Sequence, residues 1–287
     1  MENTGFVIFN KNINNNSIYY LKLKVSSSFF AKPGQFINIK ISDELIPFLR
    51  RPFSIFNFKK GSIELVYKIV GEGTKKLSEK KKNDKINFLG PLGNSYIDFF
   101  NEKILAEKKI YLIAGGTGFA SIHFLADWLT AKKIRFKLFY GARDKNELLS
   151  NFCKKYDFFI STDDGSAGKK GLITDFLNKK IEKSSILFAC GPKAMLNSIK
   201  NIKAEKKFVS LEAYMGLLPF TGNIEIPFVT IAPNFDKSKN FSNSRPYPNV
   251  PDAGITGFFK INFPILTCVL IFLFIDSIIK LNFLIQI

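Results

Sequence analysis

The sequence predicts two folded domains in a fixed order, a small antiparallel β-barrel followed by a doubly wound parallel α/β domain. Residues 5–100 carry short runs of β-branched and aromatic residues with Gly and Pro between them. From about residue 104, strand-like and helix-like patterns alternate. The chain has 287 residues, of which 46% are hydrophobic, so it is long enough and apolar enough for two cores.

The predicted barrel occupies residues 1–102 and contains five strand-like runs. Turn residues stand between these runs, at 33–34, 61–62 and 90–93. Closely spaced strands with such turns are typical of a small antiparallel barrel. The runs are GFVIFNKN, IYYLKLKV, QFINIKI, PFSIFNF and SIELVYKIV.

The predicted α/β domain spans residues 103–208. Each of four short apolar runs is followed by a helical pattern, which indicates a parallel sheet with crossover helices. The strand-like runs are KKIYLIA, RFKLFYGA, DFFISTDD and SILFACG. The helical patterns are FASIHFLADWLTAK, KNELLSNFCKKY, GLITDFLNKKIEK and PKAMLNSIKNIKAE.

The chain beyond residue 208 predicts an irregular C-terminal region. We expect a linker-like segment over 209–255, because 232–254 is rich in Asn, Ser, Pro and Lys. Residues 256–287 form an apolar tail whose run 263–275 ends at Asp276. A spanning helix needs about 17–25 residues, so we do not expect membrane attachment, although the tail leaves that alternative open.

Charge and cysteine content exclude several classes of protein. The net charge is +18, but the lysines are scattered and form no basic stripe, so we expect no nucleic-acid partner. Cys153, Cys190 and Cys268 are far apart, which predicts neither a disulfide framework nor a four-cysteine metal site. The N-terminus lacks the pattern of a secretory signal, and we therefore expect a cytoplasmic protein.

Three loops at the ends of predicted parallel strands are candidates for a nucleotide site. They contain Gly115-Gly116-Thr117-Gly118, the run STDDGSAGKKG at 161–171, and Cys190-Gly191-Pro192. Backbone N–H groups at such a strand-to-helix turn can bind phosphate. One Gly-rich turn is often only a tight turn, but three loops at one sheet edge favour a dinucleotide site. Asp163 and Asp164 either hold a ribose or cap the following turn.

A second candidate site lies in the barrel. Arg51 can bind a pyrophosphate with two hydrogen bonds, Ser54 adds a hydroxyl, and Phe53, after Pro52, offers a flat ring. The run VYKIVGEGT at 66–74 adds backbone N–H groups and the Thr74 hydroxyl. From these residues alone, a surface arginine pair and a hairpin turn explain the pattern equally well.

Six motifs together identify a family. Over residues 5–216 the chain resembles the ferredoxin reductase superfamily and, within it, the electron transfer subunits of NAD-dependent dihydroorotate dehydrogenase, type B. The motifs are LRRPFSI, VYKIVGEGTKKLSE, FLGPLGNSY, IAGGTGFAS, ACGPKAML and VSLEAYMG.

The resemblance implies an FAD-binding barrel and an NAD-binding α/β domain. The residues that match the FAD motifs are Arg51, Pro52, Phe53, Ser54, Val66, Tyr67, Lys68, Gly73 and Thr74. Those that match the NADH motifs are Gly115, Gly116, Thr117, Gly118, Cys190, Gly191 and Pro192. Lys68 replaces the usual arginine and keeps its charge without the planar fork. Ala120-Ser121 stand where the family has Ala-Pro.

The same resemblance implies a [2Fe–2S] cluster, but this chain has other residues where the family has cluster cysteines. The family's first three cluster cysteines fall in register on Leu217, Gly222 and Glu225. Thiolates are the expected ligands of such a cluster. We therefore predict no metal-ligating residues and expect the cluster to be absent. Residues 209–255 are then a degenerate iron–sulfur-type region and linker.

The function implied is electron transfer between NAD(H) and an FMN-containing dihydroorotate dehydrogenase subunit through FAD, in pyrimidine biosynthesis. The family resemblance also implies a heterotetramer. We predict no catalytic side chain, since hydride transfer between nicotinamide and flavin needs no general base. His123 is then a helix-surface or interface residue.

Three alternatives stay open. The chain is a stand-alone NAD(P)H–flavin reductase, a decayed non-catalytic remnant, or a scaffold that has kept the fold. The choice between NADH and NADPH is open too, with Arg143 near the place where a 2′-phosphate would bind.

Overall fold

The computed structural model describes residues 2–14, 18–42, 49–100, 102–177 and 180–210, together with the short strands at 224–227 and 258–261. The chain forms two compact units, Met1–Gly216 and Leu217–Ile287. The first unit contains two sheets, one for each predicted domain. The boundaries proposed at residues 102 and 208 remain predictions.

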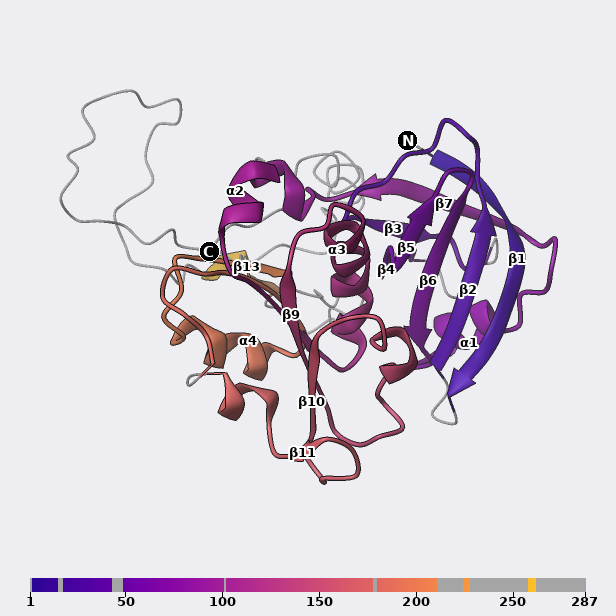
Figure 1. The fold of residues 1–287 in the computed structure, drawn as a ribbon. Coiled ribbons are helices and arrows are strands. Elements are labelled where there is room, and N and C mark those ends of the chain that lie inside the picture. The colour runs from indigo at the N-terminus through magenta and orange to yellow at the C-terminus, as the bar shows by residue number, and fades with distance from the viewer. Residues whose placement is uncertain are drawn as a thin grey trace. The chain divides into compact units, whose positions relative to one another are not determined.

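A seven-stranded antiparallel sheet forms the N-terminal half of the first unit (Figure 1). Its strand order is β4-β3-β7-β1-β2-β6-β5, and β4 also contacts β6, so the two ends of the sheet approach each other. This curled, barrel-like sheet confirms the predicted antiparallel domain. The strands are β1 (Glu2–Asn14), β2 (Ile18–Lys24), β3 (Phe36–Ile39), β4 (Arg51–Ser54), β5 (Asn57–Lys59), β6 (Ser62–Lys68) and β7 (Lys85–Leu92).

Strand β6 shows how alternation assigns side chains to two cores. Ile63, Leu65 and Tyr67 are buried within the barrel, whereas Val66 joins the core of the α/β domain. Successive side chains of a strand point to opposite faces. The strand therefore borders both domains, and its last residue, Lys68, stands where they meet.

A six-stranded parallel sheet forms the second half of the unit. Its order is β11-β10-β9-β8-β12-β13, so the chain moves outward from β8 and then returns to β12 on the other side. The switch point between β8 and β12 is where open α/β sheets bind ligands. The strands are β8 (Ile110–Gly115), β9 (Phe136–Ala142), β10 (Phe158–Thr162), β11 (Lys169–Lys170), β12 (Ile186–Cys190) and β13 (Lys206–Ser210).

Helices cover both faces of the parallel sheet. Helix α3 (Phe119–Ala131) contacts β8 and β12 on one side and β5 and β6 of the barrel on the other. Helix α4 (Lys193–Lys200) lies on the side away from the barrel (Figure 1). Helix α1 (Glu72–Ser78) follows β6, and α2 (Glu102–Glu107) precedes β8. The doubly wound α/β domain is confirmed.

Two sequence-based assignments of strands need correction. The sequence predicts a turn at Gly90-Pro91, but β7 runs through this pair and lies inside the sheet, between β3 and β1. The pairing of β3 with β7 shifts register between Phe36 and Asn38, and such an irregularity accommodates the proline. The run at 52–58 is two strands, because the chain leaves β4 after Ser54 and starts β5 at Asn57.

Two predicted helices are wrong. Residues 145–156 contain only the 3₁₀ turn η3 (Ser150–Phe152), and 171–183 contain the 3₁₀ turn η4 (Ile173–Phe176), with 178–179 outside the described residues. Side chains replace helical hydrogen bonds in the first segment. The Asp144 carboxylate accepts from the N–H of Asn146 at 2.7 Å and of Glu147 at 3.3 Å. Such bonds favour turns over helix.

The second unit is described at two strands only. β14 (Ile224–Pro227) and β15 (Phe258–Ile261) pair in antiparallel fashion, with Glu225 opposite Lys260. Leu217, Gly222 and the apolar run 263–275 lie outside the described residues. No helix in the part of the chain that the structure describes is long and apolar enough to cross a membrane.

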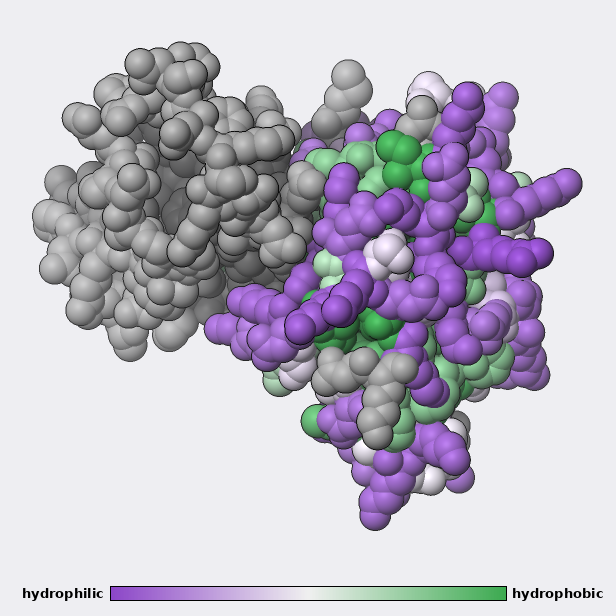
Figure 2. Space-filling view, turned by 60° about the vertical axis from the view of Figure 1, so that its left-hand side comes forward, coloured by the Kyte–Doolittle hydropathy of each residue, from purple (hydrophilic) through white to green (hydrophobic). Residues whose placement is uncertain are grey.

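Hydrophilic side chains cover most of the visible described surface, with smaller hydrophobic areas between them (Figure 2). This pattern agrees with lysines that are scattered along the sequence.

Candidate cofactor-binding site

The Arg51 side chain lies across the backbone of Gly73, so two segments predicted separately meet in space. A side-chain carbon placed on Gly73 would lie 3.3 Å from Arg51 Nε. Arg51 Nη1 donates to the carbonyl of Leu49 at 2.8 Å and to that of Arg50 at 3.4 Å. The guanidinium is therefore anchored at one nitrogen beside the start of α1.

The two adjacent arginines have different partners. Arg50 Nη2 donates to Glu2 Oε1 at 2.8 Å, so its charge is matched within the protein. Among the described residues, no carboxylate pairs with Arg51. An external anion is thus a better match for Arg51 than for Arg50, in line with the sequence-based preference.

The Thr74 hydroxyl is engaged within its own loop. Its Oγ1 accepts from the N–H of Val70 at 2.9 Å and of Gly71 at 3.2 Å, and donates to the Gly71 carbonyl at 2.9 Å. These bonds shape the turn that leads into α1. The groups left for a phosphate are the first-turn N–H groups of α1, which have no partner within the helix.

Phe53 and Tyr67 belong to the barrel core. Their rings meet edge to face at 5.6 Å, and the Tyr67 hydroxyl donates to Asn10 Oδ1 at 3.0 Å. Pro52 and Ser54, the alternate residues of β4, are half-buried. Contact between the Phe53 ring and a flavin stays a prediction.

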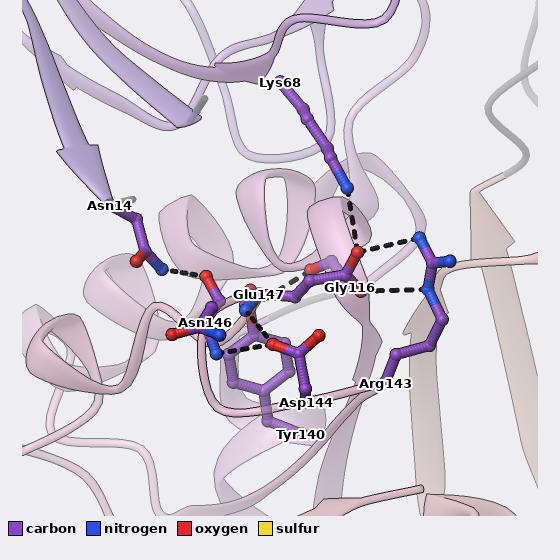
Figure 3. A network of polar contacts seen from close by, with 8 residues as sticks. All are labelled: Asn14, Lys68, Gly116, Tyr140, Arg143, Asp144, Asn146 and Glu147. Atoms are coloured by element: carbon purple, nitrogen blue, oxygen red, sulfur yellow. Dashed lines mark hydrogen bonds and ion pairs between the residues drawn. The ribbon is translucent and has the colours of Figure 1, made fainter. Parts of the chain in front are cut away.

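Lys68 meets the α/β domain through Glu147 (Figure 3). Its Nζ lies 2.8 Å from Glu147 Oε1, and Arg143 Nη2 lies 2.8 Å from the same oxygen. Burial alone would raise the pKa of the Glu147 carboxyl. The hydrogen bonds from Lys68 and Arg143 overcome that effect and lower its pKa below the ordinary value.

The buried Tyr140 hydroxyl ties this network to the glycine loop. It lies 3.2 Å from the Gly116 carbonyl and 3.3 Å from the Glu147 carbonyl, and it accepts from the N–H of Leu149 at 3.2 Å. Asn14, at the end of β1, also donates to the Asn146 carbonyl. Barrel strand ends and the Gly116 loop are therefore held by one segment, 143–149 (Figure 3).

Close packing explains two of the predicted glycines. A side-chain carbon on Gly118 would lie 2.5 Å from the Cys190 carbonyl oxygen, and one on Gly191 would lie 3.0 Å from Gly115 backbone. The loops after β8 and β12 thus touch at the switch point. Gly116 differs, since it has φ +53° and no atom within 4 Å of such a carbon. Its conformation favours glycine, and the space beside it is open.

The remaining predicted residues surround these loops. Thr117 lies in the 3₁₀ turn η2 (Gly116–Gly118), and Pro192 directly precedes α4. Cys190 is fully buried in the α/β core. Asp164 Oδ1 accepts from the N–H and hydroxyl of Ser166 at 2.9 and 2.7 Å, which supports the turn-capping interpretation for that residue.

His123 lies at the interface of the two domains, one of the two places expected for it. Its Nδ1 lies 3.0 Å from the Phe56 carbonyl, which can only accept, so Nδ1 carries the hydrogen. Nearby, Asn57 of β5 donates to Asp127 of α3 at 3.1 Å. Burial lowers the pKa of His123. Neutral histidine in a packed interface agrees with the absence of an assigned catalytic role.

Sequence reasoning missed Tyr140 and Glu147. Neither belongs to a glycine or arginine motif, and Glu147 falls in a segment read as a helix. The signal that could have found it is a charge pair spaced by four residues, Arg143 and Glu147, directly after a predicted strand.

A cavity of about 580 Å³ lies elsewhere on the α/β domain. Its walls contain no residue that matches the FAD or NADH motifs, although Ala167, Gly168 and Lys169 belong to the candidate loop 161–171. The walls are formed by Lys145, Leu148, Ser150, Phe158, Phe159, Ile160, Ala167, Gly168 and Lys169. The glycine loops and Arg51 remain the predicted site, because each of them carries donors for an anion.

The cysteines do not fit a four-thiolate cluster. Cys153 and Cys190 are free thiols, both fully buried in the α/β core. The chain has three cysteines in total, and the third, Cys268, lies outside the described residues. Within the described ranges, no three His, Cys, Asp or Glu side chains gather in a metal-binding group. The expected absence of the cluster remains a prediction.

An antiparallel barrel followed by a parallel α/β sheet, with loops facing the junction, defines a ferredoxin reductase-type protein. The NADH-dependent reduced ferredoxin-NADP oxidoreductase is similar, with 27% identity and a TM-score of 0.63 over 74% of this chain and 77% of that chain. A ferredoxin NADP⁺ reductase from Neisseria gonorrhoeae, solved with FAD and NADP, shares the fold at 13% identity, with a TM-score of 0.61 over 74% and 99%.

Curated relatives define the family more narrowly. The dihydroorotate dehydrogenase B (NAD(+)) electron transfer subunit of Bacillus velezensis is 36% identical over 190 residues, 64% of this chain and 73% of the relative. That of Fusobacterium nucleatum is 35% identical over 205 residues, 68% and 78% of the two chains. No family model matches the chain. The chain belongs to the family of electron transfer subunits of dihydroorotate dehydrogenase B (NAD(+)).

Membership confirms the resemblance inferred from the six motifs. The chain is an oxidoreductase subunit of the ferredoxin reductase type, and a catalytic dihydroorotate dehydrogenase is its implied partner.

Proposed function

We propose that the barrel of this chain binds FAD, that its α/β domain binds NAD(H), and that electrons pass between the two. One observation supports this most directly. Lys68 of a predicted FAD segment and Gly116 of the predicted NADH loop are joined through two residues, Glu147 and Tyr140. The two half-sites therefore adjoin, as transfer between bound cofactors requires.

In the proposed FAD half-site, Arg51 binds the pyrophosphate. The donor set fits this group, because a guanidinium without a carboxylate partner among the described residues lies beside the first-turn N–H groups at Gly73. Lys68 adds a positive charge at the end of β6. FAD, when bound, supplies the flavin ring that takes up a hydride.

In the proposed NAD(H) half-site, the backbone N–H groups of residues 116–118 bind phosphate at the start of α3. The positive end of a helix and its free N–H groups favour an anion there. Gly191 and Pro192 form the opposite wall across the switch point. The protein contributes binding and orientation, and no side chain transfers a proton.

The partner, by family, is a dihydroorotate dehydrogenase. We propose that it carries FMN and forms a heterotetramer with this chain, serving pyrimidine biosynthesis in the cytoplasm. The cysteine content specifically favours a second candidate function, a stand-alone NAD(P)H–flavin reductase that passes electrons to a diffusible acceptor. Adding the purified partner with dihydroorotate separates the two, because only the first candidate predicts that dihydroorotate reduces the flavin of this chain.

The direct test is the visible spectrum of the purified full chain with and without NADH. We expect a flavin spectrum that NADH bleaches. Arg51→Ala should weaken FAD binding by about 10- to 100-fold, the cost of a lost charged hydrogen bond. Arg50→Ala is the matched control, because its guanidinium pairs with Glu2. A colourless protein, or equal flavin retention in both variants, contradicts the proposal.

A further inference from the structure

Arg143 lies at the position where proteins with a dinucleotide-binding fold contact the ribose of their ligand. It directly follows β9, which pairs in parallel with β8, so it lies at the sheet edge that carries the glycine loop. At the end of this second strand, an acidic residue typically binds a ribose 2′-hydroxyl and an arginine accommodates a 2′-phosphate. Here a carboxylate and an arginine are both present.

Glu147 holds this arginine at two points. Arg143 Nη2 lies 2.8 Å from Oε1, and Nε lies 3.4 Å from Oε2 (Figure 3). The Arg143 side chain is 74% exposed, so a ligand can reach it, whereas that of Glu147 is only 14% exposed. The reachable positive charge is therefore neutralised by a carboxylate that lies beneath it.

The carboxylate is fixed in position. The Glu147 N–H donates to the Asp144 carbonyl at 3.2 Å and to its carboxylate at 3.3 Å, and its own carbonyl accepts from Tyr140. Lys68 holds Oε1 from the opposite side. The lowered pKa keeps the group ionised at neutral pH. A ligand phosphate that displaced it from Arg143 would leave this largely buried carboxylate with Lys68 as its one remaining cationic partner among the described residues.

We propose that Glu147 is a specificity-determining residue that selects NADH over NADPH by occupying Arg143 and repelling a 2′-phosphate. This inference rests on the proposed NAD(H) site. A 2′-phosphate bound at Arg143 would lie beside the Glu147 carboxylate, and two negative charges so close together near a protein surface repel each other strongly. One carboxylate is therefore enough to discriminate between the two nucleotides. The competing role, in which Glu147 only joins the domains, predicts no change in nucleotide preference.

The test replaces Glu147 with its uncharged isostere, Glu147→Gln, in the full chain. Flavin reduction is measured with NADH and with NADPH. We expect the ratio of kcat/KM for NADPH to that for NADH to rise at least about tenfold, equivalent to about 1.4 kcal/mol. Adding Arg143→Ala should abolish the gain, because the freed guanidinium is what binds the phosphate. An unchanged ratio, or a gain that survives Arg143→Ala, overturns the proposal.

A binding measurement separates this inference from the proposed function. Titration calorimetry compares adenosine 2′,5′-bisphosphate with AMP, which needs no flavin and no turnover. Glu147→Gln should tighten the bisphosphate by at least about tenfold relative to AMP. If NADH fails to bleach the flavin but this shift is present, the electron-transfer proposal fails and the specificity inference stands. If the wild-type chain and the variant bind the bisphosphate alike, or bind neither ligand, the specificity inference is wrong.

Discussion

The imidazole of His123 lies flat on the ring of Phe56, with the ring centroids 3.9 Å apart and the planes inclined by 3°. His123 belongs to helix α3, and Phe56 lies between barrel strands β4 and β5. The Phe56 ring also has edge contacts with Tyr20, Phe119 and Phe152. An aromatic cluster thus joins the two sheets of the first unit.

Phe56→Ala should destabilise the first unit strongly. The ring is fully buried, and truncation of a buried phenylalanine costs about 3–5 kcal/mol. Urea unfolding followed by the fluorescence of Trp128, the only tryptophan and a residue of α3, measures the change. Phe30→Ala is the matched control, because Phe30 is 62% exposed, and it should cost less than about 1 kcal/mol. Equal losses would contradict the interface role of Phe56.

The free energy of unfolding should fall as the pH drops below about 6.5, the pKa of histidine in an unfolded chain. Burial lowers the pKa of folded His123, so between the two pKa values the unfolded state binds more protons. The stabilisation is complete above that window and declines by at most about 1.4 kcal/mol per pH unit within it.

His123 is the only histidine, which makes the assignment of this pH dependence direct. Urea unfolding at pH 7.5 and 5.5 should show a larger loss in the wild-type chain than in His123→Gln. Asp127 at 3.9 Å is the nearest opposing charge, and it limits the shift. Parallel pH profiles in the two proteins would show that another group is responsible.

Gly118→Ala should disrupt the switch point between β8 and β12. The added carbon would lie 2.5 Å from a backbone oxygen, that of Cys190, which cannot move aside as a side-chain end can. We expect a loss of about 3 kcal/mol in urea unfolding, the upper range for overpacking. Gly71→Ala is the control, since that position has an extended φ of 177° and open space. Similar stabilities of the two variants would show that the loops separate without cost.

Thr74→Val should weaken the turn before α1. The variant keeps the shape of the side chain but loses the oxygen that accepts from Val70 and Gly71 N–H groups. Loss of such a cap costs about 1–2 kcal/mol, measured again by urea unfolding. Thr74→Ser retains the hydroxyl and should recover most of the stability. If serine is as destabilising as valine, the methyl group and not the hydroxyl stabilises the turn.

The order of the two domains and most of their strands could be read from the sequence. Period-2 alternation in runs such as residues 18–25 and buried apolar runs such as 185–191 have local causes, and the structure places strands at both. The glycine loop was recognisable for the same reason, because a strand, a turn and a helix follow one another directly.

Local sequence patterns gave wrong secondary-structure predictions where side chains or strands from outside the segment determine its backbone conformation. Residues 145–156 have helical spacing of apolar residues, but the Asp144 carboxylate and the Tyr140 hydroxyl bind their N–H groups. Strand β7 contains a proline, and its central place comes from pairing with β1 and β3. Neither partner is visible in the segment itself.

The sequence by itself determined the family, the fold class and which loops are rich in donors for an anion, since each depends on residues close together in the chain. Only the tertiary structure decided which of two adjacent arginines is matched by a carboxylate, which glycines are required by packing, and that Glu147 binds both Lys68 and Arg143. Apart from the Arg143–Glu147 pair, those outcomes depend on residues tens of positions apart in the chain, whose charges and volumes meet only after the chain has folded.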